Sequence, residues 1–183
     1  MKVLLASQSP RRKELLKTVL PEFAIESYPA DEHFKGETPE ETVKEIALRK
    51  LLAVESPERY DLIIASDTLV YKDGIYYGKP LDETDAVRML KELEGKTHVV
   101  VSGLAISYNG VRECYSVSTD VTFYPMSEAQ IKEYLSTHYC LDKAGAYAVQ
   151  DGVVVEKLNG SYSNVVGLPM EKLEEILKEK KII

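Results

Sequence analysis

The pattern of hydrophobic and polar positions predicts two kinds of strand. Two short, almost wholly apolar runs are typical of strands buried on both faces, and a pair of long runs separated only by Asn109-Gly110 predicts a β-hairpin. Two further runs, 23–27 and 153–158, predict shorter strands. In chain order, the expected strands are Val3–Ala6, 23–27, Leu62–Ser66, 97–108, 111–123 and 153–158.

Helices are predicted where helical spacing follows a starting signal. Ser9-Pro10 offers an N-cap residue followed by proline at the first helical position. Thr38-Pro39-Glu40-Glu41 and Ser127-Glu128-Ala129-Gln130 both have the pattern of a capping box. The expected helices are 10–19, 39–55, 82–94, 127–136 and 170–180.

Strands that alternate with helices, together with an antiparallel pair, predict an α/β protein with a mixed sheet. The 183 residues fit one domain, 1–183, and the sequence has no repeat or linker that would divide it. Polar residues follow both short buried strands, at Ser7–Ser9 and at Asp67-Thr68. Ligands of open α/β sheets bind at the carboxyl ends of strands, so these two turns are candidate sites.

Composition narrows the classes of function. The net charge of −7 argues against a surface that binds nucleic acid, which carries a basic excess. The two cysteines form no C-x-x-C pair, so the sequence supports neither a zinc knuckle nor a disulfide scaffold. The apolar run at the N-terminus is too short for a signal peptide, and no run is long enough to span a membrane. We therefore expect a cytoplasmic protein with neither a nucleic-acid nor a membrane partner.

Three cations, Arg11, Arg12 and Lys13, fall in the first turn of the first predicted helix, where the helix dipole disfavours positive charge. One interpretation is a solvated helix face, at a cost of up to about 1 kcal/mol for each cation. The other is an anion site, because the helix N-terminus and the guanidinium forks of arginine both bind phosphate.

Other candidate residues also have two interpretations. Asp67 is either a turn residue or a carboxylate that binds a divalent cation or accepts a proton from water. Lys79 and Glu32 are either surface residues or part of the same site. Gly95-Lys96-Thr97 resembles the end of a phosphate-binding P-loop, but Leu90 stands where that motif needs glycine. We therefore do not interpret this stretch as a P-loop.

Taken together, the motifs resemble those of the Maf family, in the same order and over nearly the whole chain. The blocks that carry the resemblance are Ser7-Gln8-Ser9-Pro10-Arg11-Arg12, Asp31-Glu32, Lys50, Ala65-Ser66-Asp67-Thr68, Gly78-Lys79-Pro80, Gly95-Lys96-Thr97-His98, Ser102-Gly103, Asp142-Lys143-Ala144-Gly145-Ala146-Tyr147, Gln150, Gly160-Ser161 and Val166-Gly167-Leu168-Pro169.

This resemblance implies a fold and an activity. The fold would be similar to that of inosine triphosphate pyrophosphatases, with two lobes around a cleft. The activity would be a house-cleaning nucleoside triphosphate pyrophosphatase that hydrolyses dTTP and UTP to the monophosphate and diphosphate, and members are commonly homodimers. Specificity in this subfamily is marked by residues that correspond to Arg11, Thr68 and Gln150.

The resemblance also implies a role for each candidate residue. Asp67 would be the catalytic base that orients and deprotonates water, and it would hold Mg²⁺ or Mn²⁺ together with Glu32. Gln150 would pair with the O4 and N3–H of a pyrimidine. Together with Gln150, the expected substrate-binding residues are Ser7, Ser9, Arg11, Arg12, Lys50, Thr68 and Lys79.

Two positions depart from the usual pattern of the family, and two alternative functions stay open. Ser66 stands where alanine is usual, an exchange expected to be harmless, and Asp151 replaces the usual glycine beside Gln150. One alternative is a pyrophosphatase for another modified nucleotide, such as 7-methyl-GTP. The other is a nucleotide-binding regulator of septum formation that does not hydrolyse its ligand.

Overall fold

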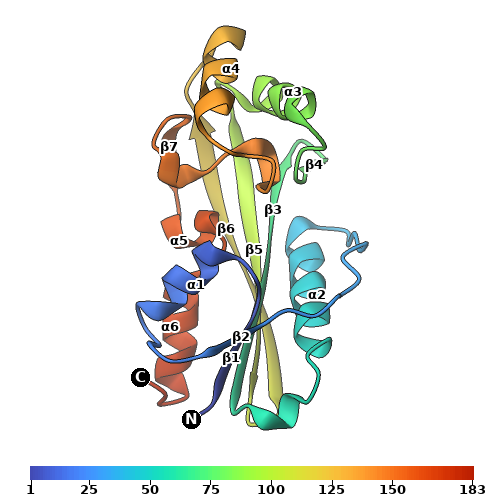
Figure 1. Ribbon diagram of the computed structural model, residues 1–183, viewed down its shortest axis with the longest axis vertical. Coiled ribbons are helices and arrows are strands. Elements are labelled where there is room, and N and C mark those ends of the chain that lie inside the picture. The colour runs from blue at the N-terminus through green and yellow to red at the C-terminus, as the bar shows by residue number, and fades with distance from the viewer. The chain divides into compact units, whose positions relative to one another are not determined.

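The computed structural model describes all 183 residues, and its elements follow one another as labelled in Figure 1. The helices and strands are β1 (Val3–Ala6), α1 (Pro10–Lys17), β2 (Ala24–Glu26), α2 (Pro39–Leu52), β3 (Leu62–Lys72), β4 (Ile75–Tyr77), α3 (Glu83–Leu93), β5 (Thr97–Tyr108), β6 (Val111–Phe123), α4 (Glu128–Thr137), β7 (Val155–Asn159), α5 (Tyr162–Val166) and α6 (Met170–Glu179). Short 3-10 turns form η1 (Pro57–Arg59), η2 (Ala144–Ala146) and η3 (Val149–Asp151). None of the helices combines the length and apolarity that crossing a membrane requires.

The strands form a mixed sheet, as expected. They pair in the order β2-β1-β3-β5-β6-β7, and β4 pairs with β3. β1 is parallel to both β2 and β3, whereas the β3–β4 and β6–β7 pairs are antiparallel. The predicted α/β class with helices around a mixed sheet is therefore confirmed.

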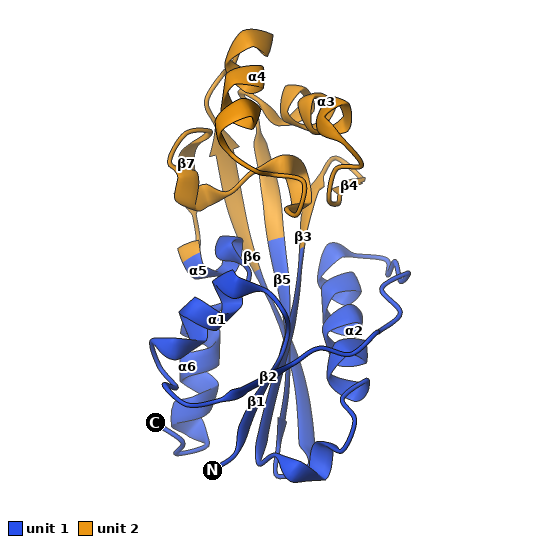
Figure 2. Ribbon diagram, viewed as in Figure 1, with its two compact units in different colours: residues 1–68, 101–117, 163–183 blue, residues 69–100, 118–162 orange.

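The chain divides into two compact units (Figure 2). Unit 1 comprises residues 1–68, 101–117 and 163–183, and unit 2 comprises residues 69–100 and 118–162. The strands β3, β5 and β6 contribute residues to both units. The expectation of one domain with two lobes around a cleft stays a prediction.

Alternation along β1 builds the core of unit 1. Val3 and Leu5 pack in one hydrophobic cluster with Leu16 of α1 and with α6, and Leu4 and Ala6 pack in a second cluster with α2. Successive side chains of a strand point to opposite faces, so one short apolar strand can serve both clusters. Accordingly, α1 and α6 lie on one side of these strands and α2 lies on the other (Figure 2).

Unit 2 has an aromatic core. Phe123, which is fully buried, packs edge-on against the rings of His98 and Tyr147, with ring centroids 4.9 and 4.6 Å away. The helix α3 packs against α4 and η2, and it buries one face. The buried residues on that face are Ala86, Met89, Leu90 and Leu93.

Most predicted helix starts are confirmed in atomic detail. The side chains of Ser9, Thr38 and Ser127 each accept a backbone N–H at the start of their helices. Only the Ser127 helix has the full reciprocal capping box. In α2, the Glu41 carboxylate accepts the N–H of Glu37, one residue before the cap, so half of that predicted box is wrong.

The largest departure from the predicted elements concerns β3. We predicted a strand that ends at Ser66, but β3 continues to Lys72 and pairs with β4 through a turn at Asp73-Gly74. Asp67 and Thr68 therefore lie within a strand instead of in the turn after it. The turn has its own sequence signal, because Asp-Gly between the strand-like runs Leu69-Val70-Tyr71 and Ile75-Tyr76-Tyr77 is typical of a hairpin.

Candidate active site

The candidate residues of unit 1 lie around the end of β1. The last registered pair between β1 and β3 is Leu5 with Ile64, and β1 ends one residue later. β3 continues, so Asp67 and Thr68 lie beyond the end of its parallel neighbour. The turn Ser7–Ser9 leaves β1 at this level and begins α1, which brings the helix N-terminus next to β3.

Two serine hydroxyl groups shape this turn. Ser7 is buried, and its Oγ accepts hydrogen bonds from the N–H of Ser9 at 3.2 Å and from Nη1 of Arg12 at 3.3 Å. The Oγ of Ser9 accepts the N–H of Arg12 at 3.4 Å as the N-cap. Both hydroxyl groups act as acceptors in these contacts, so each keeps its own hydrogen for another acceptor.

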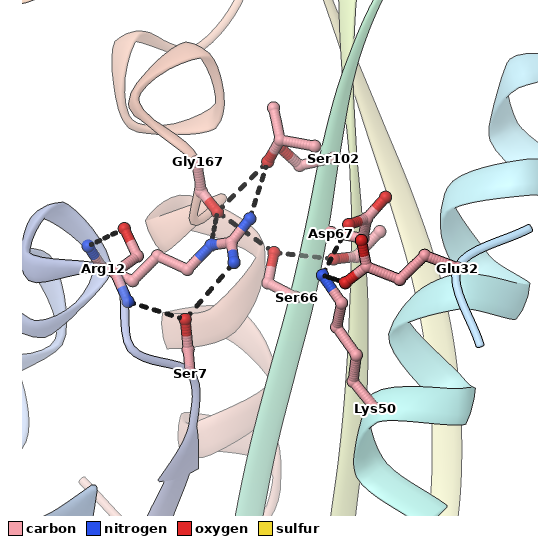
Figure 3. Close-up of polar contacts among 11 residues, drawn as sticks. Ser7, Arg12, Glu32, Lys50, Ser66, Asp67, Ser102 and Gly167 are labelled. Atoms are coloured by element: carbon pink, nitrogen blue, oxygen red, sulfur yellow. Dashed lines mark hydrogen bonds and ion pairs between the residues drawn. The ribbon is translucent and has the colours of Figure 1, made fainter. Parts of the chain in front are cut away.

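The half-buried guanidinium of Arg12 turns back from the first turn of α1 toward β3 (Figure 3). Its Nε donates to the carbonyl oxygen of Gly167 at 2.7 Å, and its Nη2 donates to Oγ1 of Thr68 at 3.2 Å. Gly167 has a φ of +128°, a conformation that favours glycine. With Ser7, these partners accept three of the five N–H groups of the guanidinium, and two remain for an anion.

Arg12 carries its charge among neutral partners. Burial is the main effect and lowers its pKa, Arg11 lowers it further, and the negative charges of Asp67 and Glu32 oppose this. No carboxylate forms an ion pair with Arg12, so its positive charge is not cancelled locally. A phosphate would supply the missing counter-charge.

Lys50 of α2 joins the two candidate acids. Its Nζ lies 2.7 Å from Oδ1 of Asp67 and 2.9 Å from Oε1 of Glu32 (Figure 3). The side chain of Asp67 is 15% exposed, whereas that of Glu32 is 58% exposed. In Figure 3, Asp67 points toward α2, whereas Ser66 points to the opposite side, toward Gly167, as the alternation of a strand requires. Thr68, the other neighbour of Asp67, accepts a hydrogen bond from Arg12 on that same side.

The two carboxylates fit a hard divalent cation in part. Both can reach the single position now held by the Lys50 ammonium, and Mg²⁺ or Mn²⁺ prefers such oxygen ligands. The chain has no cluster of three or more acidic, histidine or cysteine side chains that could hold a metal alone. The donor set therefore suits a cation that completes its coordination with substrate phosphate and water.

Unit 1 contains Ser7, Ser9, Arg11, Arg12, Glu32, Lys50, Asp67 and Thr68. The contacts above join Arg12 to Ser7, Ser9 and Thr68, and they join Lys50 to Glu32 and Asp67. The other two candidates, Lys79 and Gln150, belong to unit 2, and both are exposed. Lys79 follows Gly78, whose carbonyl oxygen accepts the N–H of Gly145 at 3.1 Å. Their roles toward the residues of unit 1 remain predictions.

The unusual Asp151 has a partner in unit 2. Its Oδ2 accepts the hydroxyl hydrogen of Tyr134 at 2.6 Å, and the same hydroxyl oxygen accepts the N–H of Ala148 at 3.2 Å. Asp151 does not have a positive φ, which the next residue, Gly152, has instead. Tyr134 therefore holds η3 on both sides of Gln150, and the aspartate causes no backbone strain.

Four residues to which the sequence assigned no role, Ser66, Ser102, Gly103 and Gly167, complete the arrangement. Oγ of Ser102 lies 2.7 Å from Oγ1 of Thr68, and the fully buried Ser66 donates to the carbonyl oxygen of Gly103 at 2.8 Å. Ser66 also lies 3.1 Å from the carbonyl oxygen of Gly167, so the exchange from alanine adds a polar group with partners. In the sequence, the only indication of these roles is that Ser102-Gly103 and Val166–Pro169 belong to the blocks that resemble the Maf family. Neither block reveals which residues are in contact.

Solved structures and curated relatives resemble this chain over its full length. "The structure of the Staphylococcus aureus Ham1 protein" aligns with a TM-score of 0.59 and 14% identity, covering 98% of this chain and 100% of that one, which establishes similarity of fold. A protein of Latilactobacillus sakei, 42% identical and covering 96% of this chain and 98% of the relative, is named dTTP/UTP pyrophosphatase. A Thermotoga maritima protein has the same name. It is 42% identical, and the alignment covers 98% of this chain and 90% of the relative.

The family assignment rests on the match of the whole sequence. The profile described as "Maf-like protein" matches residues 2–180, which include every candidate residue named above. Another relative named dTTP/UTP pyrophosphatase, from Clostridium beijerinckii, is 42% identical and covers 98% of this chain and 99% of its own length. The chain therefore belongs to the Maf family.

Proposed function

We propose that this protein hydrolyses dTTP and UTP between the α- and β-phosphates, giving the monophosphate and diphosphate. The observation that carries the proposal is that unit 1 contains both Arg12, whose hydrogen-bond partners are neutral oxygens, and two carboxylates that share Lys50. Triphosphate hydrolysis needs cations that bind the phosphates and a carboxylate that accepts a proton from the attacking water. The relatives named dTTP/UTP pyrophosphatase support the choice of substrate.

In this proposal, the N-terminus of α1 binds the triphosphate. The free N–H groups of Arg12 donate to phosphate oxygens, and Ser7 and Ser9 donate the hydroxyl hydrogens that their present contacts leave available. Arg11 adds a second guanidinium in the same turn. Lys50 and Lys79 stabilise the negative charge that develops on the leaving diphosphate.

Asp67 is the proposed base. It accepts a proton from the attacking water while the water oxygen forms the new bond to phosphorus and the anhydride oxygen leaves with the diphosphate. In this structure Oδ1 of Asp67 contacts the ammonium of Lys50. When a divalent cation replaces that ammonium, Oδ1 would bind the cation, and the other carboxylate oxygen would stay available to orient water. A divalent cation held by Glu32 and Asp67 would neutralise charge on the phosphates when it is bound.

Base recognition is assigned to Gln150. Its amide has both a donor and an acceptor, which match the O4 and N3–H that thymine and uracil share. Thr68 donates to or accepts from Ser102 and accepts from Arg12, so we propose that it fixes the arginine instead of contacting the base. Cytosine presents the reverse pattern at these two positions, which an amide fixed in the orientation for thymine and uracil cannot match, so we expect dCTP and CTP to be poor substrates.

An assay of diphosphate release over a panel of nucleotides tests the proposal. The panel contains the canonical triphosphates, 7-methyl-GTP and other modified nucleotides, each with Mg²⁺ or Mn²⁺. We expect dTTP and UTP to give the highest kcat/KM. Preference for 7-methyl-GTP would favour the first alternative, and nucleotide binding without release of diphosphate would favour the regulator.

The assembly and location form a separate part of the proposal. The resemblance to a commonly dimeric family supports a homodimer, and the cysteine usage supports the cytoplasm. Light scattering coupled to size-exclusion chromatography tests the first point, since a dimer would have twice the monomer mass of 20.6 kDa.

A further inference from the structure

The segment that carries Glu32 has no regular structure of its own. Residues 27–36 lie between β2 and α2 without helix or strand, and Glu32 is largely exposed within them. A carboxylate on such a segment has few restraints on its position. Its neighbours on the helix α2 are therefore important for holding it near Asp67.

Arg49 of α2 binds this segment on both sides of Glu32. Its Nη1 donates to Oδ2 of Asp31 at 3.2 Å and to the carbonyl oxygen of the same residue at 3.4 Å. Its guanidinium carbon lies 5.0 Å from the centre of the Phe34 ring, within the range of a cation–π contact. Asp31 and Phe34 flank Glu32 and His33, so one side chain contacts both ends of this short stretch.

Arg49 is itself fixed on the helix. Its Nε donates to Oε1 of Glu45 at 2.7 Å, one helical turn earlier, and its side chain is 30% exposed. The next residue, Lys50, contacts the Glu32 carboxylate directly. Consecutive residues of α2 therefore hold the backbone around Glu32 and the carboxylate of Glu32.

We propose that Arg49 is a positioning residue for the divalent cation: through Asp31 and Phe34 it holds Glu32 where this carboxylate and Asp67 can share one ion. This inference rests on the proposed function, in which Glu32 is a metal ligand. Residues that orient ligands matter nearly as much as the ligands, and their loss typically weakens metal binding roughly 10–100-fold.

The same contacts contribute little to the stability of the fold. The side chain of Asp31 is 65% exposed, and ion pairs between exposed groups are weakly stabilising. A variant that loses the guanidinium is therefore expected to fold normally and to bind the metal poorly. This difference separates positioning from a merely structural role.

The experiment titrates Mn²⁺ alone into the apo protein, with free Mn²⁺ followed by electron paramagnetic resonance. We expect Arg49→Met to weaken binding roughly 10–100-fold with an unchanged thermal midpoint. Arg49→Lys keeps the charge but loses the planar guanidinium, so its affinity for Mn²⁺ should lie between those of Arg49→Met and the wild type. Arg88→Met is the matched control, because Arg88 also bridges two acids on a helix, Asp85 and Glu92, but lies on α3.

Glu32→Gln separates the inference from the function on which it rests. If Glu32→Gln weakens Mn²⁺ binding and Arg49→Met does not, the positioning role is wrong and the proposed metal ligand stands. If Glu32→Gln has no effect, the metal assignment fails and the inference fails with it. A thermal midpoint of Arg49→Met that falls below that of Arg88→Met would assign Arg49 to folding and overturn the proposal.

Discussion

Nε of Arg12 donates a 2.7 Å hydrogen bond to the carbonyl oxygen of Gly167, a residue 155 positions later in the chain. This contact explains how a cation is tolerated in the first turn of α1, where the helix dipole disfavours positive charge. The guanidinium leaves the helix end and is surrounded by the oxygens of Gly167, Thr68 and Ser7. These neutral oxygens solvate the positive charge of Arg12 without neutralising it, so the guanidinium can still bind an anion.

Replacing Arg12 by lysine tests this arrangement. Lysine keeps the charge but cannot make the three directed contacts and also donate bidentately to phosphate. Since a hydrogen bond to a charged group contributes about 1.5–3 kcal/mol, we expect KM for dTTP to rise roughly 10–100-fold. Steady-state kinetics measure this, with Arg59→Lys on the exposed turn η1 as the control. An unchanged KM would return Arg12 to the solvated face of the helix.

Asp67→Asn separates catalysis from binding. The amide cannot accept a proton from water, so we expect kcat to fall by about 10³-fold, within the usual range for general bases. Nucleotide affinity measured without a divalent cation should change little, because Arg12 and the α1 N-terminus do not contact Asp67 directly. Diphosphate release gives the rate and calorimetric titration gives the affinity. Retention of near wild-type turnover would show that another group activates water.

Local features of the site were predictable from the sequence. Ser9 as N-cap and Pro10 at the first helical position follow from short-range preferences, and both are confirmed. The partners of Arg12 were not predictable in this way. Thr68 and Gly167 lie 56 and 155 residues away, and no short-range preference encodes contacts at that distance.

The extent of β3 was missed for a different reason. Charged and polar residues at Ser66–Thr68 interrupt the apolar run, and this pattern predicts that the strand ends there. The strand continues because Val70 is again buried and pairs with Tyr77 of β4. A polar interruption inside a strand is therefore a signal of a site in its own right.

Gln150→Glu tests base recognition. A carboxylate cannot donate a hydrogen bond to O4 of thymine or uracil, so kcat/KM for dTTP and UTP should fall by about tenfold or more. The effect on triphosphates with other bases should be smaller, which changes the substrate ranking. Competition assays with pairs of nucleotides measure that ranking directly. A proportional loss on all substrates would instead assign Gln150 to the fold of η3.

Tyr134→Phe tests the support of the Gln150 segment. The variant removes the hydroxyl that donates to Asp151 and accepts the N–H of Ala148, and the latter residue is buried. An unsatisfied buried polar group costs about 1–3 kcal/mol, which is the expected loss in the free energy of unfolding. Urea unfolding measures it, with Tyr139→Phe as the control because that ring is 70% exposed. Equal stability of the two variants would contradict the assigned support.

His98 gives unit 2 a predicted dependence of stability on pH. Its Nε2 lies 2.7 Å from the hydroxyl oxygen of Tyr147, and its Nδ1 has no hydrogen-bond partner. Burial, with a smaller effect from the charge of Lys72, lowers the pKa of His98 to about 4. The folded protein therefore holds this imidazole neutral at pH values where an unfolded histidine is already charged.

The sign of the effect follows from the two pKa values. An unfolded histidine has a pKa of about 6.5, so between about pH 6.5 and 4 the unfolded state binds more protons. Stability from His98 is complete above pH 6.5 and decreases as the pH falls toward 4, by at most about 3 kcal/mol. Acids with lowered pKa values change stability in the same direction, so a comparison between variants is needed.

His98→Gln isolates this contribution, because glutamine does not titrate. Urea unfolding between pH 4.5 and 7.5 should show a weaker dependence on pH for the variant than for the wild type, by up to about 1.4 kcal/mol per pH unit. Parallel pH profiles for wild type and His98→Gln would mean that the buried imidazole titrates in the folded protein as it does in the unfolded chain.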